Sequence, residues 1–326
     1  MQVSFIIPLF NCLELTRACV ASLQATLPRD LAHEIILVDD GSTDGTREWL
    51  KSLSPPAVSP PNPSNGLATL GPSFRVVLND RNLGFAAANN RGAALARGKL
   101  LALLNNDLVL PPRWLEPLLA AHRSLRGRAG LVGNVQLDAA TGAVDHAGIV
   151  LDLKGKPEHD RAAPSRLARL LAPVRRVPAV TAACVVVERA LWQQLGGFDE
   201  SYVNGGEDVD LCLRAHAAGR VNAVALRSVV RHHISSSAGR KLHDEENSRR
   251  LARRWRHEFA FFAARGWCRD YFETILVEPR DHDPSVARRV WFYALGLTRT
   301  PPPEAIAALD ASLDREFVRW EKLLGG

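Results

Sequence analysis

The chain has 326 residues, enough for one large domain or two smaller ones. Its hydrophobic fraction of 46% is ordinary for a globular protein, and no run approaches the ~20 apolar residues that would span a bilayer. The formal net charge of +6 is mild, so we expect no nucleic-acid partner, whereas small anionic ligands remain compatible with it.

The N-terminus and the cysteines indicate a cellular compartment. Residues 1–4 lead directly into an apolar segment without a basic stretch, so we expect no signal peptide. The cysteines form no Cys-x-x-Cys pair, which argues against a disulfide framework or a zinc cluster. We therefore expect a reducing, cytoplasmic location. The cysteines are Cys12, Cys19, Cys184, Cys212 and Cys268.

The first strand and helix exclude two classes of nucleotide-binding protein. A buried-strand pattern at residues 3–7 ends at Pro8, and Asn11 precedes a helical pattern with apolar residues every four positions from Leu15 to Leu27. The loop between them lacks Gly-x-Gly-x-x-Gly, which argues against a dinucleotide-binding Rossmann domain. It also lacks Gly-x-x-x-x-Gly-Lys-Ser/Thr, which argues against a P-loop NTPase.

A second buried strand at residues 35–38 ends in two carboxylates, Asp39 and Asp40. Side chains of this kind at the end of a strand are suited to hydrogen-bond a nucleoside base or ribose. The following turn copies half of a calcium loop, but its twelfth position is Lys51 instead of glutamate, so we reject calcium. We expect a helix from about Thr46, with Asp44 as its N-cap.

An α/β pattern continues after a Pro-rich stretch at residues 54–73, which we interpret as a disordered loop insertion. Strands are expected at 74–78 and 100–104, with an alanine-rich helix at 85–97 between them. This alternation predicts a parallel sheet with right-handed crossovers. The strand at 100–104 ends in Asn105-Asn106-Asp107, where α/β sheets bind ligands, although these residues also favour a simple turn.

Four segments, taken in order, resemble the inverting family 2 glycosyltransferases, which have the GT-A fold. They are residues 6–11, 38–46, 82–92 and 104–107. The variant Asn-Asn-Asp is similar to a bacterial subgroup that includes rhamnosyltransferases of surface polysaccharides. The resemblance covers roughly residues 1–240. It implies a mostly parallel central sheet flanked by helices, with a Rossmann-like nucleotide-binding half and an acceptor half.

The resemblance also implies a nucleotide-sugar donor, with UDP- or dTDP-sugars favoured, and a divalent metal, Mn²⁺ or Mg²⁺. Asp107 would bind this metal, although the family's commoner motif is Asp-x-Asp and Asn105 stands at the first position here. The residues implied in nucleotide-sugar binding are Pro8, Asn11, Asp39, Asp40, Asn82, Gly84, Asn90, Asn105 and Asn106.

The middle of the chain alternates between strand and helix patterns. Helices are expected at 113–124 and 189–195, and strands at 130–137, 143–151 and 182–187. The stretch 154–176 is basic and rich in turn residues, so it either faces phosphate or forms a solvated loop. Its arginines include Arg161, Arg166, Arg169, Arg175 and Arg176.

A glycine-rich segment at 196–206 precedes a helix that begins near Asp208. Transfer of a sugar to an alcohol requires a base that accepts the hydroxyl proton in the transition state, a role worth ~10²–10⁴ in rate. The resemblance makes Asp208 that base, ahead of Glu207 and Asp210. The alternative is that Asp208 only complements the N-terminus of the helix. One base on the acceptor implies a single displacement with inversion.

A histidine pair, His232 and His233, follows a strand expected at 221–226. A lone histidine is more often structural, but the family often has a metal-binding histidine at this place. The resemblance therefore implies a metal ligand, with His232 preferred over His233. Imidazole would replace the ligand that Asn105 cannot supply.

The last third matches the family poorly and is expected to form helices at 247–264 and 305–323. Its tryptophans are interpreted as packing anchors. A sharper hypothesis is a basic, aromatic surface that contacts a membrane-linked acceptor, with the protein peripheral at the inner face of the membrane. The residues considered are Arg249, Arg250, Arg253, Arg254, Arg256, Trp255, Phe259 and Phe262.

The sequence thus predicts a GT-A glycosyltransferase domain at 1–240 and a helical extension at 241–326. We expect a hexosyltransferase-type enzyme that transfers a sugar to a hydroxyl of a glycan or lipid-linked acceptor, in cell-surface polysaccharide biosynthesis. Two alternatives remain. Asn105 is compatible with a nucleotide-sugar binding protein that no longer catalyses. A sugar-phosphate nucleotidyltransferase has a similar sheet, but residues 8–11 lack its Gly-rich, Arg-containing loop.

Overall fold

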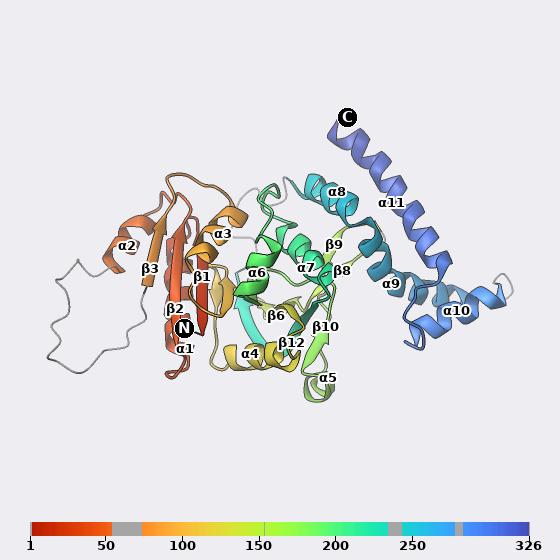
Figure 1. The fold of residues 1–326 in the computed structure, drawn as a ribbon, viewed down its shortest axis with the longest axis horizontal. Coiled ribbons are helices and arrows are strands. Elements are labelled where there is room, and N and C mark those ends of the chain that lie inside the picture. Colours follow the sequence, from red (N-terminus) through yellow and green to blue (C-terminus); the bar gives the residue numbers. More distant parts are fainter. Residues whose placement is uncertain (1, 54–73, 153, 234–242, 278–282, 326) are drawn as a thin grey trace. The chain divides into compact units, whose positions relative to one another are not determined.

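The computed structural model describes residues 2–53, 74–152, 154–233, 243–277 and 283–325 (Figure 1). The chain forms two compact units, one of residues 1–148 and 161–238 and the other of residues 149–160 and 239–326. The expected insertion at 54–73 lies outside the described residues. In the described part, no helix combines the length and the apolar character that crossing a membrane requires.

The first unit contains a ten-stranded sheet in its described residues, and four neighbouring strands of it are parallel. Their order is β3-β2-β1-β4, and every residue of β1 is buried, as its unbroken apolar run predicts. These strands are β1 (Val3–Leu9), β2 (His33–Asp39), β3 (Phe74–Leu78) and β4 (Leu100–Leu104). The helices between them are α1 (Leu13–Thr26), α2 (Thr46–Leu53) and α3 (Phe85–Leu95).

The second half of the sheet is mixed. β11 (Cys184–Glu188) runs antiparallel to both β4 and β6 (Ala129–Asp138), and β12 (Val221–His232) is parallel to β6. Consequently β12 runs in the same direction as β4, and their carboxyl ends lie at the same edge of the sheet. The other elements are β5 (Leu108–Val109), β7 (Val144–His146), β10 (Val174–Arg176), α4 (Leu115–Ser124), α5 (Arg166–Leu171), α6 (Arg189–Leu195) and α7 (Glu207–Ala217).

Close packing explains the small residues of α3. A Cβ atom at Gly92 would lie 2.5 Å from Cγ2 of Ile6 in β1 and 3.1 Å from Cγ2 of Val38 in β2. The opposite face of the sheet carries the large core side chains, among them Phe5 and Trp114, whose rings are 6.4 Å apart. Burial of each such side chain stabilises the fold by ~1.5–3 kcal/mol. The carboxyl edge of the sheet is therefore held by a rigid scaffold.

In its described residues, the second unit joins a hairpin to four helices. Glu245 accepts hydrogen bonds from Nζ of Lys156 (2.7 Å), Nε1 of Trp320 (2.6 Å) and Arg319, which links the hairpin loop to the helices. The helix expected at 247–264 is instead two helices, because the backbone leaves the helical conformation at Trp255 (φ −119°, ψ 32°). The elements are β8 (Ile149–Leu151), β9 (Pro157–His159), α8 (Asp244–Arg254), α9 (Arg256–Val277), α10 (Pro284–Ala294) and α11 (Pro303–Leu324).

Candidate active site

The polar residues after β4 lie at the carboxyl edge of the sheet. The backbone N–H of Asn105 donates to the carbonyl of Ala183 (2.8 Å), and Nδ2 of Asn106 donates to Oγ1 of Thr16 in α1 (2.8 Å). Oδ1 of Asn105 is buried and has no hydrogen-bond partner among the described residues. A buried, unsatisfied acceptor costs ~1–3 kcal/mol, so a bound ligand that donates to this oxygen would relieve the cost.

Asp107 and His232 meet at this edge although they belong to distant parts of the sequence. Oδ1 of Asp107 lies 3.2 Å from Nε2 of His232, and the two side chains are 14% and 4% exposed. The chain leaves β4 and pairs through β5 with the end of β12, where Leu108 lies opposite His232. His233 is fixed beside them, because its backbone N–H donates to the carbonyl of Asp107 (3.1 Å).

The donor types at this pair fit a divalent cation. Carboxylate and imidazole are both common ligands of Mn²⁺, and adjacent ligands about 2.1–2.2 Å from an octahedral ion lie roughly 3 Å apart. The 3.2 Å between Asp107 and His232 agrees with that separation. No group of three or more His, Cys, Asp or Glu residues that would hold a metal occurs in the described residues. Other ligands would therefore have to come from a bound substrate or water.

Asp39 and Asp40, predicted to contact the nucleoside, are buried and bonded by protein donors. Asp39 pairs with Nε of Arg47 at 2.7 Å. The Asp40 carboxylate accepts from Nδ2 of Asn79 (2.7 Å), and it also accepts from the backbone N–H groups of Leu83 and Gly84 (2.9 Å each). These contacts hold the turn that begins α3. A direct contact with a nucleoside remains a prediction.

Pro8 and Asn11 lie where β1 passes into α1. Pro8 is buried and paired with Val38 of β2. Asn11 adopts the left-handed conformation (φ 55°), and its Oδ1 accepts from the backbone N–H of Thr43 (2.8 Å). Asp44 joins the starts of two helices, because its carboxylate accepts from the N–H groups of Leu13 (2.9 Å) and Thr46 (3.2 Å).

Asn82 and Gly84 precede α3, and Asn90 lies within it. The N–H of Gly84 donates to Oδ1 of Asn82 (2.9 Å). Asn90 points towards the segment that precedes α7: its Oδ1 accepts from the N–H of Phe198, and its Nδ2 donates to the carbonyl of Phe198, both at 2.9 Å. A further bond from Nδ2 reaches Glu200 (2.8 Å). These contacts give Asn90 a positioning role, whereas its predicted contact with the nucleotide remains untested.

Asp208 and Glu207 are the first residues of α7. Oδ2 of Asp208 accepts from the N–H of Ala182 (3.1 Å), and Oδ1 accepts from the N–H of Val209 (2.8 Å). Asp208 is half-buried, whereas Glu207 is buried and accepts from the N–H of Gly205 (2.8 Å). Because Ala182 precedes Ala183, which accepts from Asn105, short contacts link Asp208 to the end of β4.

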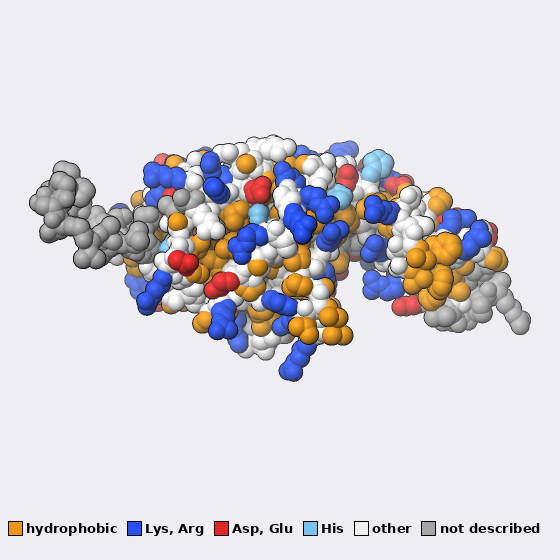
Figure 2. Space-filling view, turned by 60° about the horizontal axis from the view of Figure 1, so that its bottom comes forward, with side chains coloured by type: hydrophobic (Ala, Val, Ile, Leu, Met, Phe, Trp, Pro, Cys, Tyr) orange, Lys and Arg blue, Asp and Glu red, His pale blue; other side chains and the backbone are white. Residues whose placement is uncertain are grey.

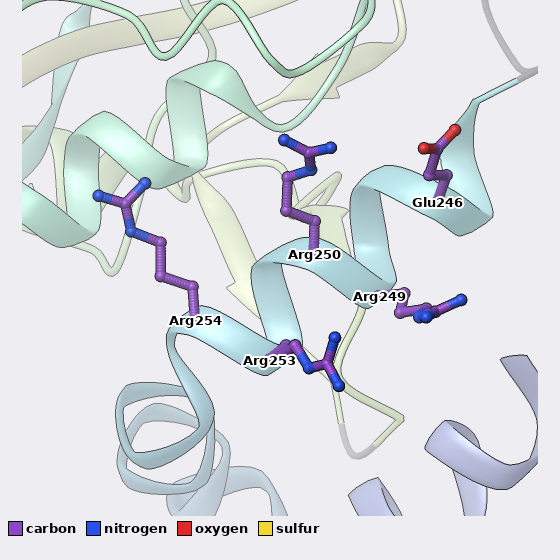
Figure 3. Close-up of a pocket in the computed structure, with 5 residues that line it drawn as sticks. All are labelled: Glu246, Arg249, Arg250, Arg253 and Arg254. Atoms are coloured by element: carbon purple, nitrogen blue, oxygen red, sulfur yellow. The ribbon is translucent and has the colours of Figure 1, made fainter. Parts of the chain in front are cut away.

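The basic, aromatic surface expected near residues 249–262 is only partly present. The aromatic members Trp255 and Phe259 are buried, and Arg256 pairs with Asp310 and Asp314 (2.8 Å each). The remaining arginines extend from α8 and line a hollow of about 510 Å³ (Figure 3). Its lining residues are Glu246, Arg249, Arg250, Arg253 and Arg254, so none of the predicted site residues contributes to it.

Several residues that shape the site carried no signal in the sequence. Ala182 and Ala183 act through their backbone groups, for which residue type is uninformative. Arg47, in the first turn of α2, donates to Asp39 at the end of β2 (2.7 Å), and Arg91 donates to Oδ1 of Asn79 (2.6 Å).

A family model described as glycosyl transferase family 2 matches residues 4–135. That range contains β1 to β4, the Asn105-Asn106-Asp107 segment and most of β6. It therefore covers the carboxyl edge of the sheet but ends before Asp208 and His232.

Curated relatives extend the similarity along the chain. An O-antigen biosynthesis protein, RfbC of Myxococcus xanthus, is 31% identical over 72% of this chain, and the uncharacterized protein y4gI of Sinorhizobium fredii is 33% identical over 79%. The chain spans only 18% and 28% of those two proteins. The N-acetylglucosaminyl-diphospho-decaprenol L-rhamnosyltransferase of Mycobacterium tuberculosis is 28% identical, with 77% of this chain and 81% of that protein covered.

Solved structures show the same fold. GalNAc-T7, crystallised with UDP, GalNAc and Mn²⁺, has a TM-score of 0.60 at 20% identity and covers 81% of this chain and 50% of its own. Residues 1–349 of Staphylococcus aureus TarS have a TM-score of 0.55 at 15% identity, with 99% of this chain and 90% of that chain covered. At these identities the likeness concerns the GT-A fold.

Proposed function

We propose that the chain is a member of glycosyl transferase family 2, whose model matches residues 4–135, and that it transfers a sugar from a nucleotide-sugar donor to a hydroxyl group, with inversion. The acceptor is a glycan or a lipid-linked glycan of cell-surface polysaccharide biosynthesis. The rhamnosyltransferase of Mycobacterium tuberculosis and the O-antigen protein RfbC support this assignment by their names. We place its site of action in the cytoplasm, peripheral to the membrane. The unpaired state of all five cysteines supports the reducing compartment.

The main support for the mechanism is the position of Asp208 relative to Asp107 and His232. Asp208 bonds to Ala182, and the adjacent Ala183 bonds to Asn105, so the proposed base lies at the sheet edge that also carries Asp107 and His232. A base and a group that stabilises the departing diphosphate must flank the anomeric carbon in a single displacement. The proximity of these two groups at one edge supports that arrangement.

In the proposed reaction, the Asp208 carboxylate accepts the proton of the acceptor hydroxyl as the hydroxyl oxygen attacks the anomeric carbon. The bond between that carbon and the diphosphate oxygen breaks, and the nucleoside diphosphate leaves with the bonding electrons. Attack from the opposite face inverts the anomeric centre. The hydrogen bonds from Ala182 and Val209 fix the orientation of the carboxylate without removing its remaining lone pairs.

Asp107 and His232 would hold a divalent cation, Mn²⁺ or Mg²⁺. Such an ion, when bound, neutralises charge on the departing diphosphate, a contribution of several kcal/mol. Oδ1 of Asn105, two residues before Asp107, is a buried acceptor that a bound donor could use. The Mn²⁺ in the structure of GalNAc-T7 supports metal dependence in this fold.

Calorimetric titration with UDP, dTDP, GDP and CMP, each with and without Mn²⁺, tests the donor site. We expect selective, metal-dependent binding of one diphosphate, with UDP or dTDP favoured. Turnover is then assayed with sugars carried by that nucleotide, and the anomeric configuration of the product is determined. Binding without turnover on any acceptor would instead support a non-catalytic nucleotide-sugar binding protein, the alternative that Asn105 favours.

A further inference from the structure

Helix α5 presents its leucines to the solvent. Leu167, Leu170 and Leu171 share one helical face, and they are 62%, 67% and 73% exposed. None of the six residues of α5, all of them described, is buried. A leucine stripe normally faces the core of a protein, so this helix has the opposite orientation from an ordinary surface helix.

Polar contacts hold α5 in place without help from the leucines. Oγ of Ser165 accepts from the N–H of Ala168 (3.1 Å) and caps the start of the helix. Arg227 of β12 donates to the carbonyls of Arg169 (2.7 Å) and Leu170 (2.9 Å) near its end. The leucines therefore contribute little to the stability of the isolated chain, and their apolar face is left for a partner.

The surroundings of α5 are strongly basic. Residues 161–187 contain five arginines and no aspartate or glutamate. Arg166 and Arg176 are exposed, and Arg161 has a long contact of 3.6 Å with Asp145. Figure 2, which brings the lower side of Figure 1 forward, shows apolar and basic side chains together where α5 lies.

We propose that α5 docks on an anionic membrane surface, with its leucines in the boundary between headgroups and acyl chains and its arginines at the lipid phosphates. A second copy of the chain is a poorer occupant. A twofold contact through α5 would bring two five-arginine segments together, and like charges repel. This membrane contact rests on the proposed function, because it specifies the surface of the peripheral location proposed there. Vesicle binding nevertheless requires neither a sugar donor nor an acceptor, so it can be measured independently of transferase activity.

The test is co-sedimentation with phosphatidylcholine vesicles, prepared with and without phosphatidylglycerol. The wild-type protein is expected to bind the anionic vesicles, and added salt should weaken this binding. The double variant Leu167→Ser/Leu171→Ser should bind about tenfold or more weakly, because shallow insertion of its side chains is lost. Both leucines are exposed, so the variant is expected to unfold at the wild-type temperature, which circular dichroism checks.

The matched control is Trp291→Ser/Leu297→Ser. Trp291 lies in α10 and Leu297 follows it, and the two side chains are 47% and 66% exposed. We expect this variant to bind vesicles like the wild type. Loss of binding in the control alone would move the membrane contact to α10 and overturn the proposal. The proposal would also be overturned if the wild-type protein did not bind anionic vesicles. It would equally be overturned if light scattering showed a wild-type dimer that is lost in the α5 variant. Metal-dependent nucleotide binding, measured on the same samples, separates these outcomes from failure of the transferase assignment.

Discussion

Oδ1 of Asp107 and Nε2 of His232 lie 3.2 Å apart, and both side chains are largely withdrawn from solvent. The approach depends on the short strand β5, which takes the chain from the end of β4 to the end of β12. Two ligand types suited to a divalent cation are thereby placed together before any ligand binds. This relationship leads to the first prediction.

Substitution of either member should remove metal-dependent nucleotide binding. For Asp107→Ala and His232→Ala we expect a loss of about 10²-fold or more in affinity for the selected nucleoside diphosphate with Mn²⁺, because a metal ligand is lost. Binding without Mn²⁺ should change little. His257→Ala, at an exposed position of α9, is the control. Equal affinities in all three variants, by calorimetry, would exclude the pair as a metal site.

The second prediction concerns the base. Asp208→Asn keeps the size of the side chain and an acceptor for the N–H of Ala182, so the fold should persist. We expect kcat to fall by ~10²–10⁴ because the proton acceptor is lost, while affinity for the donor stays the same. Single-turnover kinetics with a labelled donor measures both quantities. A variant that retains wild-type kcat would leave Asp208 only the role of complementing the α7 N-terminus.

Asn90 allows its two possible roles to be separated. Asn90→Ala leaves the N–H and carbonyl of Phe198 without their side-chain partner, at a cost of ~1–3 kcal/mol in the free energy of unfolding. Asn90→Asp should be at least as destabilising, because it places a carboxylate oxygen against the Phe198 carbonyl and Glu200. Urea unfolding measures these costs. If Asn90→Ala instead kept the wild-type stability but bound the nucleotide more weakly, the result would support the predicted contact between Asn90 and the nucleotide.

Gly41 provides a test of the turn after β2. A Cβ atom there would lie 2.6 Å from the carbonyl carbon of Arg81 and 2.7 Å from the nitrogen of Asn82, and φ is +83°. For Gly41→Ala we expect a loss of about 3 kcal/mol or more, from backbone strain and overpacking together. Gly127→Ala, at φ +75° with no atom within 4 Å, isolates the strain and should cost only ~1–2 kcal/mol. Similar unfolding midpoints for the two variants would contradict this account.

The second unit should lose stability in acid through Glu245. Partial burial raises the pKa of this carboxyl, but hydrogen bonds from Arg319, Lys156 and Trp320 outweigh that effect and lower the pKa to about 2. A carboxyl whose folded pKa is depressed stabilises the fold above its unfolded pKa, and the contribution disappears as pH falls through the folded value. The stability difference between wild type and Glu245→Gln should therefore narrow between pH ~4.5 and ~2. Chemical unfolding at several pH values checks this, and a constant difference would contradict it.

The sequence predicted the parallel half of the fold well, because strands buried on both faces have unbroken apolar runs that residues 3–7 and 35–38 display. It did not predict the break between α8 and α9. Leu251, Trp255 and Phe259 are all buried at helical spacing, so the apolar pattern continues through a point where the backbone does not.

The site shows a similar division. Asp107 follows β4 and His232 ends β12, and their side chains lie 3.2 Å apart. The metal-binding role that the family resemblance implies for both residues stays a prediction. Asp40 was selected for a carboxylate that suits a nucleoside, and Asn90 through the family resemblance, but in the structure both side chains bind backbone atoms of the protein. A carboxylate or an amide satisfies either partner equally well, and residue type alone does not distinguish them.

The irregular pairing of β12 with β6 has a consequence for the evolution of the site. Ala225 lies opposite Asn134 and Val229 opposite Val135, so residues 226–228 have no counterparts on β6. Residues without partners can absorb the gain or loss of one residue, so the pairing of residues 229–232 with β6 and the face on which His232 lies can be kept. Insertions and deletions should therefore be tolerated better at residues 226–228 than at residues 229–232, where a shift of one residue would turn the imidazole to the opposite face of the sheet and away from Asp107.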